Sequence, residues 1–197
     1  MDFLSGTRLL LRAIEPEDVS FVYRWENDPS AWGDGCALAP YSRYAIRTYI
    51  EESQRQDIFQ SRQLRLMIVC QNDKSVAGMV DLFDFDPYHR RAAVGIYVDT
   101  RYRKQGMASE ALELLCRYAF DFLHLHQLYA HVAERNAASL RLFESSGFER
   151  CGLLSQWICR DKGCRHLAAY RSDLRIFEII DFLINNRYTV WQAGKYK

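Results

Sequence analysis

The segment that most constrains the fold joins an apolar strand to a helix through a short basic loop. Residues 94–98 read Val-Gly-Ile-Tyr-Val, the loop 99–105 contains two arginines and a lysine, and Gly106-Met107-Ala108 opens a helix. A helix start offers free backbone N–H groups and the positive end of the helix dipole, and small residues let an anion approach closely. The segment therefore predicts a phosphate site, although a solvated basic turn with an incidental glycine is the alternative. It lacks the G-x-x-x-x-G-K-[ST] pattern of a P-loop.

Hydrophobic periodicity along the rest of the chain predicts one mixed domain with the element order β-α-α-β-β-β-α-β-α-β-β. This order favours an α+β fold with a largely antiparallel sheet flanked by helices. The expected strands are 7–14, 64–70, 75–85, 92–99, 127–134, 148–157 and 165–171, and the expected helices are 16–27, 42–56, 106–123 and 136–146. The domain is expected to span 1–171, followed by a helix and tail over 172–197.

Composition narrows the class of protein. The 197 residues are 49% hydrophobic, which can fill a real core, and their net charge is +1. A charge so near zero argues against a nucleic-acid binder, which needs a basic excess. No apolar run reaches membrane-spanning length, and the first residues lack the pattern of a secretory signal. The six cysteines include no C-x-x-C pair, so we expect reduced thiols, no metal site and a cytoplasmic location.

Two motifs carry a resemblance to a known family. Arg103-Lys104-Gln105-Gly106-Met107-Ala108 matches [Q/R]-x-x-G-x-[G/A] after the fourth strand, and residues 136–148 match an N-x-x-[A/S] helix that ends in Gly-Phe. With these motifs, the sequence resembles the GCN5-related N-acetyltransferases (GNAT family), over roughly residues 7–171. Within the family it most resembles the ribosomal-protein N-terminal and spermidine acetyltransferase branch. The resemblance implies a sheet that splays between its fourth and fifth strands.

The resemblance also implies an acetyl-CoA site. The pyrophosphate would bind the N–H groups of residues 105–109, and the pantetheine arm would pair with the backbone of 96–98. Asn136 would reach the pantetheine, although asparagine is also a favoured helix N-cap. The cofactor contacts expected on this basis are Ile96, Tyr97, Val98, Arg103, Lys104, Gln105, Gly106, Met107, Ala108, Ser109, Asn136, Ser139 and Phe143.

The residues for acetyl transfer are only partly evident. His131 shares a strand face with Tyr129 and lies where relatives carry a glutamate base; it is a candidate general base, or alternatively a histidine that holds a neighbouring carbonyl. A backbone N–H near Tyr97 or Val98 would stabilise the oxyanion. The family's usual tyrosine acid is replaced by Phe143, so the acid would be the hydroxyl of Ser139 or Tyr97, or the thiolate would leave unassisted.

Acceptor recognition is predicted from acidic and aromatic residues. Asp81 and Asp84 lie on the third strand, and the resemblance to the spermidine enzymes, which carry acidic residues at corresponding places, makes them candidates to attract a cationic amine. Their spacing of three puts them on opposite strand faces unless a bulge intervenes, and a solvated acidic edge is the alternative. Trp32 and Tyr41 lie in the loop between the first two helices, which is expected to cover the acceptor.

These features predict an acetyl-CoA-dependent N-acetyltransferase that acts on a primary amine, either a protein or peptide N-terminus or a small amine. A polyamine N-acetyltransferase is the first alternative. A non-catalytic acyl-CoA sensor or interaction module is the second, and an unrelated nucleotide-phosphate binder is the third. No nucleic acid or membrane partner is expected, and homo-oligomerisation is left open.

Overall fold

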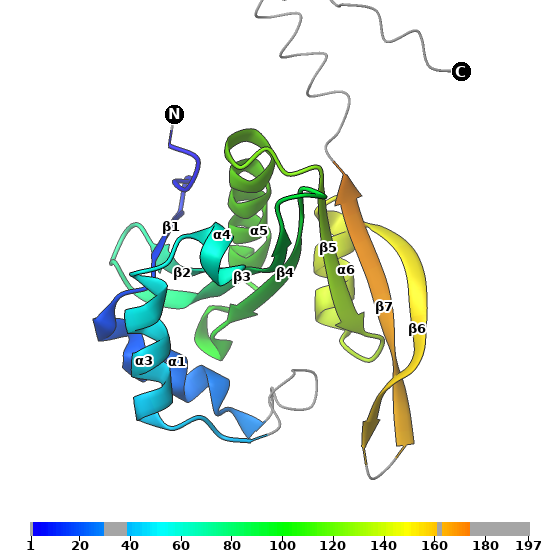
Figure 1. Ribbon diagram of the computed structural model, residues 1–197, viewed down its shortest axis with the longest axis horizontal. Helices are drawn as coiled ribbons and strands as arrows, with labels where there is room; N and C mark the ends of the chain where they lie inside the picture. Colours follow the sequence, from blue (N-terminus) through cyan, green and yellow to red (C-terminus); the bar gives the residue numbers. More distant parts are fainter. Residues whose placement is uncertain (1, 30–38, 161–162, 174–197) are drawn as a thin grey trace, which may run out of the picture.

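The computed structural model describes residues 2–29, 39–160 and 163–173, and their strands form one twisted seven-stranded sheet (Figure 1). The strand order is β1-β2-β3-β4-β5-β7-β6, and every neighbouring pair is antiparallel except β4 and β5. The strands are β1 (Leu9–Ala13), β2 (Leu64–Cys70), β3 (Val76–Asp86), β4 (Arg91–Val98), β5 (Gln127–Ala133), β6 (Glu149–Arg160) and β7 (Gly163–Asp173). The predicted α+β class and largely antiparallel sheet are confirmed.

Four main helices cover the two faces of the sheet. They are α1 (Val19–Glu26), α3 (Arg43–Ser53), α5 (Met107–Arg117) and α6 (Ala137–Ser145). Ser42 begins α3 as predicted, because its hydroxyl accepts the N–H of Ala45 at 3.0 Å. The helix expected over 106–123 is α-helical only to Arg117 and continues as a π-helical turn over Tyr118–Phe122, and a short helix, α4 (Ile58–Ser61), was not predicted.

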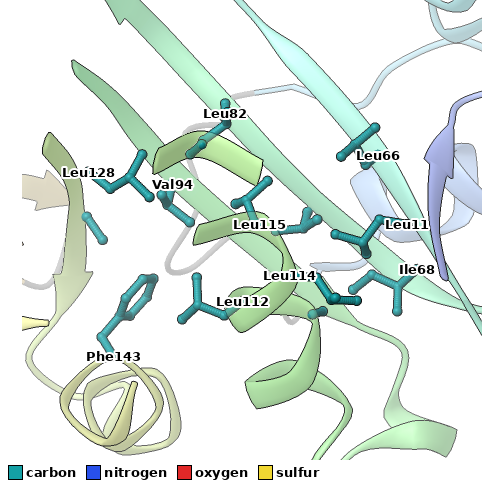
Figure 2. Close-up of a cluster of buried hydrophobic side chains, with 14 of the residues drawn as sticks. Leu11, Leu66, Ile68, Leu82, Val94, Leu112, Leu114, Leu115, Leu128 and Phe143 are labelled. Atoms are coloured by element: carbon teal, nitrogen blue, oxygen red, sulfur yellow. The ribbon is translucent and has the colours of Figure 1, made fainter. Parts of the chain in front are cut away.

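Alternation along the strands builds a separate core on each face. Val94 of β4 and Leu128 of β5 pack against Leu112 of α5 and Phe143 of α6 on one face (Figure 2). On the other face, Met67 of β2 and Met79 of β3 contact the apolar sides of α1 and α3. Because the side chains of a strand point alternately to the two faces, odd-numbered residues of β4 and β5 face the α1–α3 side.

The C-terminal end of the sheet extends slightly beyond the expected strand. β7 continues through Asp173, and Ser172 and Asp173 pair with Leu128 and Gln127 of β5. Ser172 and Asp173 therefore belong to the sheet, and the rest of the predicted helix and tail, 174–197, lies outside the described residues. Among the described helices, none is both long and apolar enough to cross a bilayer.

Candidate functional site

The strands β4 and β5 separate as the resemblance implied. They pair only from Arg91 opposite Gln127 to Ala93 opposite Tyr129, and beyond those residues no further pairing joins them. Figure 1 shows the two strands diverging toward their carboxyl ends. The α5 and α6 helices follow these strands, so both helix N-termini lie at the carboxyl ends of a parallel pair, a common position for ligands in α/β structures.

The open edge of β4 offers its own backbone groups to a ligand. Asp99 donates its N–H to the carbonyl of Ala77 on β3 at 2.9 Å, which fixes the direction of the alternating N–H groups along β4. The N–H and C=O groups of Ile96 and Val98 consequently face the gap, and those of Tyr97 face β3. Of the two residues expected to offer an N–H to the oxyanion, Val98 directs its N–H into the gap, whereas the N–H of Tyr97 points toward β3.

The start of α5 is shaped for close approach by an anion. Gly106 precedes the helix with φ +77°, a left-handed conformation that favours glycine, and no side chain caps the first turn. A Cβ on Gly106 would lie 3.1 Å from Nη2 of Arg8. Arg8 also donates from Nη1 to the Gln105 carbonyl at 2.9 Å and from Nε to Glu110 at 2.7 Å. Arg8 thus places a guanidinium, paired with Glu110, beside the loop and the helix start, although it lies outside the motif.

The basic residues of the loop have different partners. Arg101 donates to Asp99 through Nε and Nη2, both at 3.1 Å. Arg103 donates from Nε to the gap-facing carbonyl of Val98 at 2.8 Å, and its guanidinium lies 5.6 Å from the centre of the Tyr97 ring. Arg103 therefore stabilises the end of β4, and Lys104, in the left-handed region with φ +61°, extends the basic loop toward the helix.

The helix α6 carries the second motif, and its residues lie in different surroundings. The side chain of Asn136 caps the helix by accepting the Ser139 N–H at 3.1 Å, so the alternative role predicted for Asn136 is present. Ser139 is half-buried in the first turn. The Phe143 side chain is only 3% exposed and packs on Phe148 and Tyr170, with ring centroids 5.0 and 6.3 Å apart. Phe143 is a core residue with almost no surface to offer a cofactor.

The candidate base lies on the face of β5 that is turned toward the α1–α3 side of the sheet. His131 is exposed, and its ring centroid is 5.7 Å from that of half-buried Tyr129. Burial raises the pKa of the Tyr129 hydroxyl, and the negative charge of Asp84 raises it further. The pKa of Tyr97 on the same face of β4 is also raised, first by burial and then by Asp28, so its hydroxyl keeps its proton near neutral pH.

Asp81 is already neutralised inside the protein. Arg65 donates to both Asp81 oxygens, at 2.8 and 2.9 Å, and to Glu26 of α1 at 2.7 Å. The Arg65 side chain is 12% exposed and its guanidinium lies 5.3 Å from the centre of the Tyr49 ring of α3. Arg65 therefore joins Asp81 in the sheet to Glu26 of α1, and Asp81 is paired with this arginine and is not an open site for a cation.

A bulge changes the position expected for Asp84. The β3–β4 register shifts between Phe83 and Asp86, and Asp84 has φ +49°. Before the bulge, Leu82 points into the α5–α6 core; after it, Phe85 does so. Asp84 consequently lies on the same face as Asp81, beside Tyr129, and is exposed. A bulge was the condition under which Asp81 and Asp84 could lie on one face of the strand, and the structure contains it.

The remaining acceptor candidates lie in the loop after α1. Tyr41 is exposed, and its backbone N–H donates to the Asn27 side chain at 2.8 Å, which fastens the end of the loop to α1. Trp32 lies outside the described residues. Among the described residues, no group of three or more His, Cys, Asp or Glu is arranged to hold a metal ion.

Sequence reasoning missed three residues around the gap. Arg8 lies 97 positions from its partner Gln105, and Arg65 lies 39 positions from Glu26. Asp99 closes β4 and bonds to two elements. Such charged pairs could have been found only by combining the strand order with a search for unmatched charges.

Comparison with known proteins assigns the chain to a class. The fold matches the crystal structure of spermidine N-acetyltransferase from Vibrio cholerae in complex with CoA and spermine, with a TM-score of 0.77, 22% identity, and coverage of 85% of this chain and 96% of that chain. Residues 8–149 match the model of the acetyltransferase (GNAT) domain. The chain belongs to the GNAT acetyltransferase domain family.

Curated relatives agree with this assignment. Spermidine N(1)-acetyltransferase of Escherichia coli strain K12 is 29% identical over 146 residues, which are 73% of this chain and 74% of that protein. A Bacillus subtilis protein provisionally named a ribosomal N-acetyltransferase is 29% identical over 107 residues, 52% of this chain and 56% of that protein. The chain is thus an N-acetyltransferase with acetyl-CoA as its co-substrate, which confirms the predicted enzyme class.

Proposed function

We propose that this enzyme transfers the acetyl group of acetyl-CoA to a primary amine of a small polycationic acceptor. The observation that carries the proposal is the gap beside Ile96–Val98, with an acidic and aromatic surface on its acceptor-facing side. The polyamine class is supported by the likeness to spermidine N-acetyltransferases and by the bulge that brings exposed Asp84 next to Tyr129. Dodecameric assembly is described for the Vibrio cholerae enzyme, and we propose that this chain also forms oligomers.

The cofactor would bind along the open edge of β4. Its phosphates would lie at the N–H groups of residues 105–109, near Arg8 and Lys104. Its pantetheine amides would pair with the gap-facing groups of Ile96 and Val98. Met107, Ala108, Asn136 and Ser139 would line this path from the two helix N-termini. Phe143 would contribute by holding α6 in place and not by contact.

The transfer requires three catalytic contributions from the protein: a general base, stabilisation of the oxyanion and a proton for the thiolate. His131 would accept the proton of the ammonium, directly or through water, so that the amine attacks the thioester carbonyl. The N–H of Val98 or Ile96 would stabilise the oxyanion. The hydroxyl of Tyr97 or of Ser139 would protonate the departing thiolate; the raised pKa of Tyr97 keeps a proton available there.

A thiol-release assay with acetyl-CoA and an amine panel tests the proposed acceptor. We expect spermidine and spermine to give the highest kcat/KM, and a peptide with a free N-terminus to react poorly. The reverse order would instead support a protein N-terminus, the second candidate, which the ribosomal N-acetyltransferase relative favours. CoA binding by calorimetry without thiol release from any amine would identify a non-catalytic acyl-CoA sensor.

The proposed base is tested by replacing His131 with alanine. We expect turnover to fall by about 10²-fold or more, and the profile of rate against pH to change, because a general base must be free of its proton before it can accept one from the amine. The matched control is His89→Ala, which removes an exposed imidazole from the β3–β4 turn. An unchanged profile for H131A eliminates this base and leaves the acetyltransferase assignment intact.

A further inference from the structure

Asp99 lies where β4 ends and the basic loop of residues 99–105, which we call the cofactor loop, begins. The carboxylate of Asp99 is almost fully enclosed. The side chain is only 7% exposed. From α1, Arg24 donates through Nη2 at 2.8 Å and Trp25 through its indole Nε1 at 3.0 Å. From the loop, the backbone N–H of Arg101 and two of its guanidinium nitrogens donate at 3.1 Å. One carboxylate therefore bonds both to the acceptor-side helix and to the cofactor loop.

A second line of contacts runs parallel to this link. The Trp25 ring lies 5.5 Å from the ring of Tyr97, and the guanidinium of Arg103 lies 5.6 Å from that same Tyr97 ring. Arg103 in turn donates to the Val98 carbonyl, which faces the gap. A movement of α1 would therefore be transmitted to the end of β4 through Tyr97 and Arg103, and to the loop through Asp99.

Charge-assisted hydrogen bonds make this junction stiff. The donors hold the pKa of Asp99 well below its ordinary range, chiefly through Arg101, so the carboxylate is charged whenever the enzyme works. Arg24 is half-exposed, and its bond to Asp99 can break without opening a core. The bonds from Arg101 can change as an anion settles on the loop, because its guanidinium is largely exposed.

We propose that Asp99 is a positioning residue that links the cofactor loop to α1, so that CoA binding at the loop orders the helix beside the acceptor. The inference rests on the proposed cofactor site. Because CoA binding at the loop would already have ordered α1, an acceptor that binds beside α1 would pay less of that ordering free energy. CoA bound first would therefore strengthen acceptor binding. By reciprocity, an acceptor held against α1 would strengthen CoA binding.

Hydrogen exchange with CoA as the only ligand tests this link without any acceptor. In the wild-type enzyme we expect CoA to slow exchange roughly fivefold or more both in residues 99–109 and in α1, residues 19–26. In the double variant R24Q/W25F, which removes both donors of α1 and leaves Asp99 bonded to Arg101, the loop should still be protected and α1 should not. D99N should lose both effects. Asp73→Asn, an exposed carboxylate bonded only to Ser75, is the matched control and should behave as wild type.

Each outcome has a distinct meaning. Equal protection of α1 by CoA in wild type and R24Q/W25F overturns the link while leaving the cofactor site standing. Failure of the wild type to bind CoA in calorimetry overturns the proposed function itself. If D99N or the double variant does not fold, the single variants R24Q and W25F still decide, because each removes one of the two α1 donors, leaves Asp99 bonded to Arg101 and should lose part of the protection of α1. As a kinetic readout, R24Q should raise the KM for the amine more than the KM for acetyl-CoA.

Discussion

Phe143 occupies the position where many family members carry a tyrosine acid, and its surroundings explain what the phenyl ring does instead. The ring is packed between Phe148 and Tyr170 and has almost no exposed surface. A hydroxyl added to this ring would have to find a partner inside the core or remain without one. Phe143 therefore packs α6 against the sheet, and a tyrosine at this position would bury its hydroxyl.

Phe143→Tyr should consequently cost stability without restoring an acid. We expect the free energy of unfolding to fall by about 1–3 kcal/mol, the usual cost of an unsatisfied buried hydroxyl, with no increase in kcat. Urea unfolding and the thiol-release assay measure the two quantities. Phe122→Tyr, on an exposed ring, is the control and should stay within about 0.5 kcal/mol of wild type. A rise in kcat for F143Y would show that the ring edge reaches the gap.

Asp99 should also leave a signature in the pH dependence of stability. Its pKa in the folded enzyme is lowered, chiefly by the Arg101 side chain. Its contribution is therefore fully present above the ordinary aspartate pKa of about 3.9 and is lost as pH falls below that value toward the folded pKa. D99N should be less stable than wild type at pH 5–7, and the difference should shrink below about pH 4. Urea unfolding at several pH values measures it; a constant difference across that range would contradict the argument.

At the scale of elements, the start of α5 depends on a backbone conformation. Gly106 and Gly147 both have positive φ, +77° and +82°, but only Gly106 adjoins the cofactor loop. Alanine at either position should cost about 1–2 kcal/mol of stability, because a Cβ is disfavoured in the left-handed region.

The two alanine variants should separate in their kinetics. G106A should raise the KM for acetyl-CoA roughly tenfold, equivalent to ~1.4 kcal/mol, since its Cβ would strain the backbone at the helix start and crowd Nη2 of Arg8. G147A, the matched control, should keep the wild-type KM. Equal KM values for both variants would remove Gly106 from the proposed cofactor site.

Much of the element pattern could be predicted from the sequence. Apolar runs bounded by turn residues located every strand of the described sheet, and Ser42 marked the start of α3, because these signals lie within a few residues of one another. The bulge at Asp84 could not be predicted, since its cause is the register between two strands. The Arg65–Asp81 and Arg8–Gln105 contacts join distant parts of the chain, so only the tertiary fold shows that Asp81 is neutralised and that Arg8 lies beside the loop.

At the scale of the whole molecule, the sheet consists of two parts joined by a short seam. β1–β4 form one part and β5–β7 the other, and only the pairs from Arg91–Gln127 to Ala93–Tyr129 connect their strands. A ligand that pairs with β4 inside the gap would bridge the two parts. Binding should therefore stabilise the whole fold and not only the loop.

Thermal unfolding with increasing CoA measures this effect. At 100 times its Kd, CoA should stabilise the fold by ~2.7 kcal/mol, which raises the Tm of a chain of this size by roughly 5–11 °C. ATP is the control ligand, because it carries phosphates without a pantetheine arm, and it should give a much smaller shift. An equal shift with ATP would indicate a general nucleotide-phosphate site.

The strand order β5-β7-β6 also has a consequence for synthesis on the ribosome. The strands β1 to β4 can pair each with the one before it as they emerge, whereas the main partner of β5 is β7, the last strand to be made. The strand β5, which forms one side of the gap, therefore depends on a pairing that forms late and between distant residues, and such long-range pairings fold slowly. A nascent chain that has not yet delivered β7 should hold a folded β1–β4 half but no cofactor, so the enzyme becomes active only after nearly all of its sheet has been translated.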